Sequence, residues 1–253
     1  MCLLIQKGDF MYKNYVFDLY GTLIDLNTDE NDDNLWKKMA IYYGYKGANY
    51  TYEEIHSEYL RLVEKEINLA KSRHKEYSGV DIKLEKVFKE LFAQKGVTVT
   101  DSQILFVAEM FRCFSTKYIK LYDGVIDLLD TLKAKGKKIY LLSNAQRVFT
   151  ENELNMFDLT KYFDGICLSS DEECLKPDVN YFKILFDRYG LKKEESIMIG
   201  NDHISDIGGA ADFGIDSLYI NQSISPDIND DEIRSTYKVM DGDVYKIKKL
   251  IVK

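Results

Sequence analysis

The strongest constraint on the fold is an alternation, between residues 121 and 222, of short apolar runs with longer amphipathic segments. Short runs rich in β-branched residues predict strands, and segments with a 3.6-residue apolar period predict helices. The predicted strands are KKIYLLSN at 137–144, FDGICL at 163–168, SIMIG at 196–200 and DSLYI at 216–220. The predicted helices cover 123–136, 147–156, 178–190 and 203–213. Because parallel strands need crossovers of this length, the pattern predicts an α/β fold with a parallel sheet and helices on both faces.

Residues 27–118 differ in character, since they contain no convincing strand pattern. Their amphipathic segments predict four helices, within 35–44, 52–74, 83–96 and 102–114. This helical insert separates an earlier strand, YVFD at 15–18, from the rest of the sheet. We therefore expect a core domain of residues 1–26 and 119–253 and an inserted helical domain of residues 27–118. In the tail, weaker helical patterns occur at 230–237 and 243–250.

The charge balance and the cysteines limit the possible partners and compartment. The chain carries 42 acidic and 34 basic residues, a formal net charge of -8, which argues against binding to nucleic acid or to an anionic membrane surface. None of the four cysteines forms a C-x-x-C pair, so reduced thiols are expected. Residues 1–13 lack the pattern of a secretory signal, and no apolar run approaches the roughly 20 residues of a membrane span. We expect a cytoplasmic protein, and an anionic substrate would need a local positive site.

Polar side chains stand where several predicted strands end. Asp18 closes the first strand, and Ser143-Asn144 closes the next one along the chain. Lys176-Pro177 stands before the predicted 178–190 helix, and Asp202 and Asp206 follow the strand at 196–200. Each feature alone is ordinary turn or helix-capping chemistry. In an open parallel sheet, however, ligands bind beyond the carboxyl ends of the strands, where all of these residues would meet.

Two of these acids suggest a cation. Asp202 and Asp206 are four residues apart, so they lie on one face of a first helical turn and repel each other unless a cation compensates them. Together with Asp18 they would form a cluster of hard oxygen ligands suited to magnesium.

The same residues resemble the four ordered motifs of the haloacid dehalogenase (HAD) superfamily. The motifs are Asp18-Leu19-Tyr20-Gly21-Thr22, Ser143-Asn144, Lys176-Pro177, and Gly200-Asn201-Asp202 with Asp206. The resemblance covers roughly residues 14–220, and the helical insert resembles the C1 cap of that family. It implies an α/β fold with a Rossmann-like parallel sheet core and an inserted α-helical cap domain.

The resemblance also implies a chemical role for five of the residues. Asp18 would be the nucleophile that forms an aspartyl intermediate, which water then hydrolyses. Ser143 and Lys176 would hold the phosphoryl oxygens, and Thr22 and Asn144 would complete the oxygen cradle. The implied activity is hydrolysis of a small phosphorylated metabolite, whose identity the sequence does not reveal. The oligomeric state is equally hidden in the sequence.

A magnesium site follows from the resemblance in the same way. Asp202 would join Asp18 and the backbone carbonyl of Tyr20 around Mg²⁺, and Asp206 would act directly or through water. The cap would open to admit substrate and close to exclude water.

Tyr20 departs from the pattern of the family's phosphatases. These enzymes usually carry at this position a second aspartate that protonates the leaving alcohol, a contribution worth about 10²- to 10⁴-fold in rate. A tyrosine there resembles the family's metal-independent 2-haloacid dehalogenases, whose halide leaving group needs no proton. Their fourth motif, however, resembles Ser-Ser-Asn, whereas this chain carries Asp202 and Asp206 there. Two extra acids in a dehalogenase site are harder to explain than one missing acid in a phosphatase site. We therefore favour the magnesium-dependent phosphatase, with a dehalogenase and a catalytically weak phosphate-binding regulatory protein as alternatives.

Four further residues could be mistaken for site residues. We expect His203 to lie in the first turn of a helix near the site without a catalytic role, because magnesium does not favour imidazole. His56 and His74 are expected on the surface of the charged cap helix. Arg147 begins the helix after Ser143-Asn144 and is a weaker candidate for contact with an anion.

Overall fold

The core of the protein is a six-stranded sheet in which every strand pairing is parallel. The computed structural model describes residues 12–252, so most of the stretch expected to lack a secretory signal lies outside the described residues. The strands are β1 (Asn14–Phe17), β4 (Lys138–Ser143), β5 (Gly165–Leu168), β6 (Ser196–Gly200), β7 (Asp216–Ile220) and β8 (Tyr237–Val239). Their order is β5-β4-β1-β6-β7-β8, so the chain moves outward from β1 on one side before it returns to β6 on the other. That reversal places the switch point of the sheet at β1.

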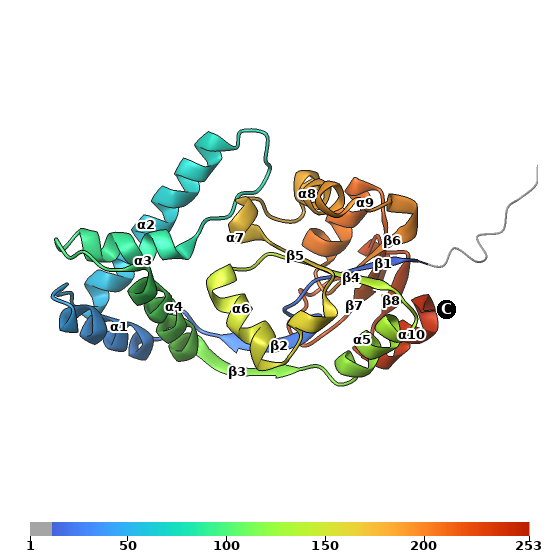
Figure 1. The fold of residues 1–253 in the computed structure, drawn as a ribbon, viewed down its shortest axis with the longest axis horizontal. Helices are drawn as coiled ribbons and strands as arrows, with labels where there is room; N and C mark the ends of the chain where they lie inside the picture. Colours follow the sequence, from blue (N-terminus) through green and yellow to red (C-terminus); the bar gives the residue numbers. More distant parts are fainter. Residues whose placement is uncertain (1–11, 253) are drawn as a thin grey trace, which may run out of the picture.

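Alternate residues of each central strand pack on opposite faces of the sheet, as a two-residue period requires. Tyr15 and Phe17 join the apolar cluster formed with α5 (Val125–Ala134) and α10 (Val244–Ile251). Val16, between them, joins the cluster formed with α8 (Val179–Tyr189) and α9 (Gly209–Phe213). Figure 1 shows these two pairs of helices on opposite sides of the sheet. The predicted α/β core is confirmed.

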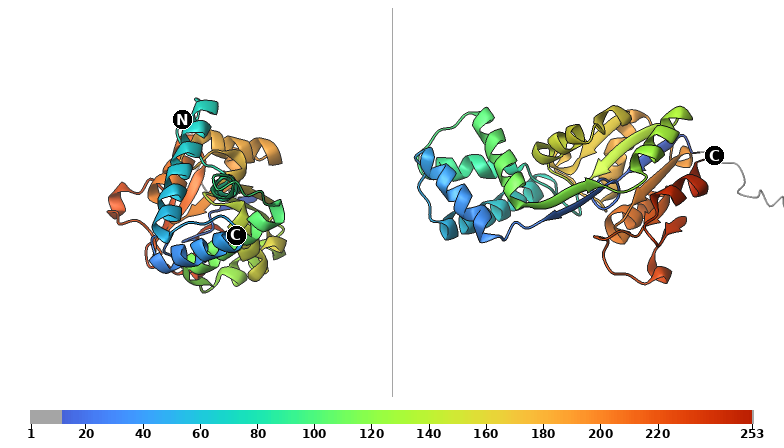
Figure 2. Two further views of the ribbon diagram at one scale, coloured as in Figure 1. Left: turned by 90° about the vertical axis from the view of Figure 1, so that its left-hand side faces the viewer. Right: turned by 90° about the horizontal axis from the view of Figure 1, so that it is seen from below.

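The segment predicted to be helical forms a separate group of four helices at one end of the molecule (Figures 1 and 2). They are α1 (Asp33–Tyr45), α2 (Tyr52–Arg73), α3 (Leu84–Ala93) and α4 (Asp101–Ser115). Their apolar faces enclose a cluster of aromatic residues, among them Trp36, Tyr43, Phe88, Phe92 and Phe111. This group, with its own apolar cluster, is called the cap below.

The two connections between core and cap are strands, which the sequence analysis did not predict. β2 (Ile24–Thr28) and β3 (Thr116–Leu121) pair antiparallel in a two-stranded ribbon. Figure 2 shows the ribbon running from the core to the cap. The expectation of a strand-free segment at 27–118 is therefore wrong at both ends. The predicted boundaries after residues 26 and 118 lie inside the ribbon, and the division into two domains stays a prediction.

The end of the chain also differs from the prediction. The expected helix at 230–237 is instead a short 3₁₀ turn at Asp230–Glu232, followed by the edge strand β8. The other expected tail helix is present as α10. The predicted helix at 203–213 begins as one π-helical turn, His203–Gly208, and continues as α9.

Two further observations bear on the sequence analysis. Within residues 12–252, no helix combines the length and apolar character that crossing a membrane demands. Cys113, Cys167 and Cys174 are free thiols. The remaining helices are α6 (Arg147–Met156), the short α7 (Ser169–Glu172), and 3₁₀ turns at Thr160–Tyr162 and Lys193–Glu195.

Candidate active site

Asp18 directly follows β1, at the switch point of the sheet. Its backbone N–H donates to the Ile199 carbonyl at 2.9 Å, so the strand ladder fixes its position. The residue is 7% exposed. Its Oδ1 accepts hydrogen bonds from Ser143 Oγ at 3.0 Å and from Lys176 Nζ at 2.7 Å. The structure therefore brings together three of the predicted site residues, with Ser143 and Lys176 lying 125 and 158 positions after Asp18 in the sequence.

Lys176 is a buried cation held between two carboxylates. Its Nζ lies 2.7 Å from Asp18 Oδ1 and 2.6 Å from Asp206 Oδ1. Burial lowers the pKa of Lys176, but the charges of Asp18 and Asp206 outweigh burial, so the net effect is a raised pKa. Burial raises the pKa of Asp206 to about 7, although the charge of Lys176 acts to lower it. Lys176 is thus a buried positive charge directly beside the carboxylate of Asp18.

Asp202 and Asp206 follow β6 but do not form the expected three-carboxylate cluster with Asp18. Among the described residues, no group of three or more Asp, Glu, His or Cys side chains is arranged to hold a metal ion. Asp202 Oδ1 accepts from the backbone N–H of Ile204 and Ser205 at 2.8 and 3.0 Å, so it caps the π-helical turn. Asp206 is bonded to Lys176 and, through Oδ2, to the backbone N–H of Asp202 at 3.0 Å. Helix capping and Lys176 engage these carboxylates in this structure, and their predicted role as metal ligands stays a prediction.

A smaller set of oxygen ligands remains compatible with magnesium. Asp18, Tyr20, Asp202 and Asp206 line one cavity of about 240 Å³. Asp18 Oδ2 makes only a 3.5 Å contact with Thr22 Oγ1, in contrast to the two close bonds of Oδ1. A hard cation prefers such carboxylate and carbonyl oxygens. The residues present therefore fit Mg²⁺ through Asp18, Asp202 and the Tyr20 carbonyl, without direct ligation by Asp206.

Asn144 and Asn201 hold the loops that surround Asp18. The Asn144 amide, expected in the phosphate cradle, bonds the backbone of Lys176: Nδ2 donates to the carbonyl at 3.0 Å and Oδ1 accepts from the N–H at 2.8 Å. Asn201 is buried, lines the cavity, and accepts from Thr22 Oγ1 at 3.4 Å. Sequence reasoning did not assign Asn201 a role, although its place between Gly200 and Asp202 in the fourth motif was a usable signal.

Gly21 allows this close packing. Its φ is +84°, and a Cβ built on it would lie 2.3 Å from Asn201 Nδ2. Only glycine adopts this conformation at low cost and leaves room for the asparagine.

The hydroxyl of Tyr20 is directed toward helix α6. It donates to Glu153 and lies 3.0 Å from Thr150 Oγ1. Glu153 in turn accepts from Arg112 Nε of cap helix α4 at 2.6 Å. Burial, followed by the charge of Glu153, raises the pKa of Tyr20. The phenol therefore stays protonated and is engaged by Glu153 and Thr150.

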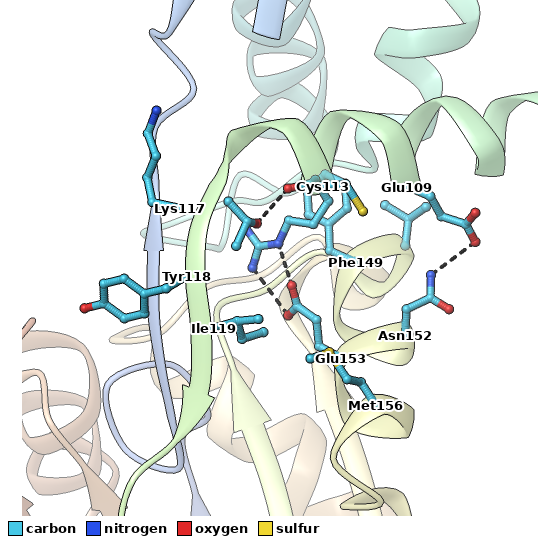
Figure 3. Close-up of a pocket in the computed structure, with 12 residues that line it drawn as sticks. Glu109, Cys113, Lys117, Tyr118, Ile119, Phe149, Asn152, Glu153 and Met156 are labelled. Atoms are coloured by element: carbon cyan, nitrogen blue, oxygen red, sulfur yellow. Dashed lines mark hydrogen bonds and ion pairs between the residues drawn. The ribbon is translucent and has the colours of Figure 1, made fainter. Parts of the chain in front are cut away.

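A second cavity lies beside this network. It has a volume of about 400 Å³ and is lined by residues of α4, β3 and α6, including Phe149, Glu153 and Met156. Figure 3 shows Glu153 with its ion pair at this groove, and Asn152 bonded to Glu109 nearby. The lining residues differ from those of the Asp18 cavity.

The four secondary candidates have other roles or surroundings. Arg147 forms an ion pair with Asp171, its Nε 2.6 Å from Oδ2. His56 is half-buried and stacks on Trp36 with ring centroids 4.5 Å apart, so its predicted surface position is wrong. His74 stacks on Tyr77 and is also half-buried. His203 is not among the residues lining the Asp18 cavity, and its Nδ1 has no partner among the described residues.

Comparison with known proteins identifies the family. The model of the haloacid dehalogenase-like hydrolases matches residues 12–214. The chain belongs to this family. This HAD hydrolase is 24% identical over 213 residues to pyrimidine 5'-nucleotidase PynA of Streptococcus pneumoniae, covering 83% of this chain and 84% of the relative. It is 25% identical over 226 residues to (S)-2-haloacid dehalogenase 4A of Burkholderia cepacia, with the same coverage.

The fold of this HAD hydrolase also matches solved structures. The HAD-hydrolase YfnB from Bacillus subtilis, solved bound to magnesium, aligns with a TM-score of 0.55 and 18% identity. The alignment covers 95% of this chain and 99% of that protein. At this identity the likeness establishes the fold, and relatives of both enzyme classes leave the reaction to be argued from the site.

Proposed function

We propose that this HAD hydrolase is a magnesium-dependent phosphatase that acts on a small phosphorylated metabolite. The observation that carries the proposal is the pairing of the Asp18 carboxylate with both the Ser143 hydroxyl and the buried Lys176 ammonium. Such fixed donors beside a nucleophile stabilise the charge that develops on phosphoryl oxygens. The similarity to a pyrimidine 5'-nucleotidase supports the same class of substrate.

In the proposed reaction, an oxygen of Asp18 attacks phosphorus and the bond to the leaving oxygen breaks, which gives an aspartyl-phosphate. Lys176 and Ser143 bind the phosphoryl oxygens, and Lys176 also lessens repulsion between Asp18 and the anion. Water then attacks the intermediate, releases inorganic phosphate and regenerates Asp18. Magnesium held by Asp18, Asp202 and the Tyr20 carbonyl would offset part of the negative charge.

The test is phosphate release from p-nitrophenyl phosphate by the wild-type protein and by Asp18→Asn. We expect Mg²⁺-dependent turnover that EDTA abolishes, and a loss of at least about 10³-fold in kcat for Asp18→Asn because an amide is a poor nucleophile. Asp101→Asn is the matched control, since Asp101 lies on the cap with its side chain 93% exposed. Full activity of Asp18→Asn would contradict the proposal.

The second candidate is a metal-independent 2-haloacid dehalogenase. Two observations favour it: the Tyr20 hydroxyl is engaged by α6, and the chain is 25% identical to a haloacid dehalogenase over most of its length. Against it, Asp202 and Asp206 share the cavity with Asp18 and would repel a carboxylate substrate. Halide release from 2-chloropropionate without metal would establish this function. Absence of both activities, with retained vanadate binding, would favour a regulatory phosphate-binding protein.

A further inference from the structure

Residues 78–82 of the cap, called the strap here, contact the core next to Lys176. They lie between α2 and α3, where the chain passes beside α7 (Figure 1). The Leu175 N–H donates to the Gly79 carbonyl at 3.2 Å. The Ser78 N–H and Oγ donate to Asp178 Oδ2 at 2.5 and 2.9 Å. The strap is therefore bonded to the chain on both sides of Lys176.

Asp81 connects the strap to the loop that follows Ser143. Its Oδ1 accepts from Gln146 Nε2 at 3.0 Å, and its Oδ2 accepts from Ser169 Oγ at 2.5 Å. Ser169 Oγ also accepts from the Ala145 N–H at 2.7 Å, which binds the same loop a second time. The carboxyl group of Asp81 thus joins the strap to two core segments, the loop after Ser143 and the start of α7.

The two loops held by the strap are also joined to each other, since the Asn144 amide pairs with both backbone groups of Lys176. The strap, the loop after Ser143 and the segment around Lys176 are therefore each bonded to the other two. These contacts surround Ser143 and Lys176, the two residues that donate to Asp18. A displacement of about 1 Å in such groups can cost about 100-fold in rate.

We propose that Asp81 and Ser78 are positioning residues, through which the strap holds Lys176 and Ser143 in place against Asp18. This role rests on the proposed phosphatase function. It implies that the phosphate site is correctly arranged only when residues 78–82 of the cap contact the core. Neither residue lines the Asp18 cavity, so their effect passes through Gln146, Ser169 and Asp178.

A contact that served only to join cap and core would have a different effect. Glu173 provides such a contact, because its carboxylate is bonded to Arg73, His74 and Lys86 of the cap. Loss of that ion-pair cluster would weaken the attachment without removing the bonds of the strap. Loss of Asp81 removes bonds to the catalytic loops themselves and should therefore reduce kcat.

The first experiment compares Asp81→Ala with Asp81→Asn in steady-state phosphate release. We expect Asp81→Ala to lower kcat about 10- to 100-fold while KM changes by less than about threefold, because charge stabilisation in the transition state is lost. Asp81→Asn should retain near wild-type kcat, since its amide can accept from Gln146 and donate to Ser169. Asp101→Ala, on the exposed cap surface, is the matched control. A wild-type kcat in Asp81→Ala, or an equal loss in Asp81→Asn, would overturn the proposal.

A second measurement does not depend on activity. Amide hydrogen exchange at Leu175 and Lys176 should be faster in Asp81→Ala and in Ser78→Ala than in the wild type, and unchanged in Asp101→Ala. If the wild-type protein releases no phosphate, the proposed function fails, but faster exchange would still support the positioning role. Unchanged exchange in both strap variants would overturn it.

Discussion

Lys176 sets the charge balance around Asp18. Its side chain is 1% exposed, and its ammonium group contacts both Asp18 and Asp206. Removing one member of such a buried group leaves an uncompensated charge, which is costly. The same contacts explain why the three acids do not gather as a cation cluster, since Asp206 already has a permanent cationic partner. At the residue scale, Lys176 is the positive charge that the proposed reaction would use to bind an anionic substrate.

Tyr20 gives a prediction about the leaving group. Because Glu153 and Thr150 engage its hydroxyl, we expect no proton donation from Tyr20 to the leaving group. The value of kcat/KM should therefore fall steeply as the pKa of the leaving alcohol rises across a series of phosphate esters. Tyr20→Phe should keep the steep dependence. Tyr20→Asp should flatten it and raise turnover of alkyl phosphates, by up to about 10²-fold.

Steady-state kinetics of the wild type, Tyr20→Phe and Tyr20→Asp across the ester series test whether Tyr20 protonates the leaving group. A flattened dependence in Tyr20→Phe, or a wild type that cleaves alkyl and aryl esters equally well, would show that the tyrosine does assist the leaving group.

At the scale of elements, α7 and the loop after it are held by charges from the cap. Glu173 ends α7 in a left-handed conformation, φ +51°, which is unusual for a residue with a side chain. Burial raises its pKa, but hydrogen bonds from Arg73, His74 and Lys86 outweigh this and lower the pKa to about 2. The ionised side chain is therefore bound more favourably in the folded protein than in the unfolded chain.

This cluster predicts a pH-dependent stability. Since the folded pKa lies below the ordinary value of 4.5, the stabilisation is present above about pH 4.5 and is lost as the pH falls toward 2. Glu173→Gln should lower the free energy of unfolding at pH 7 by about 1–2 kcal/mol, a value that allows for the exposed cationic partners. Urea unfolding across this pH range checks it. Identical pH profiles for wild type and variant would contradict the role of Glu173.

At the scale of the whole molecule, the apolar cluster of the cap is joined to the apolar clusters of the core. The cap cluster also takes in Val148 and Phe149 of helix α6, and the sheet with its helices encloses further clusters. The antiparallel ribbon of β2 and β3 connects them covalently, and the strap connects them through hydrogen bonds. Asp18 lies in the core at the end of β1, and the residues that line its cavity come together only in the folded chain.

Ligand binding should therefore stabilise the folded protein. Mg²⁺ with orthovanadate, which imitates a phosphoryl group, binds the assembled site and not the unfolded chain. At 100 times the dissociation constant this adds about 2.7 kcal/mol, or about 5–10 °C in Tm for a chain of this size. Differential scanning calorimetry checks the shift, and EDTA should remove it. A Tm that does not respond to the combination would count against the magnesium-dependent site.

The sequence alone determined the α/β class, the main strands and helices and the family, because these depend on local signals. Apolar periods of two and 3.6 residues specify the elements, and Asp18, Ser143, Lys176 and Asp202 stand beside strand or helix ends that the sequence marks. Parallel strand ends share one edge of a sheet, so the meeting of Asp18 with Ser143 and Lys176 also follows from the pattern.

Only the tertiary structure decided which atoms these side chains contact. The bond from Tyr20 to Glu153 spans 133 positions and that from Ser78 to Asp178 spans 100, and no local pattern encodes either. The same holds for the ribbon, whose strands are separated by the entire cap and acquire their pairing from each other. These contacts depend on long-range packing, that is, on shape and burial in three dimensions. Packing thus directed Tyr20 toward α6, paired Asp206 with Lys176, and placed the strap against the loops that carry Ser143 and Lys176.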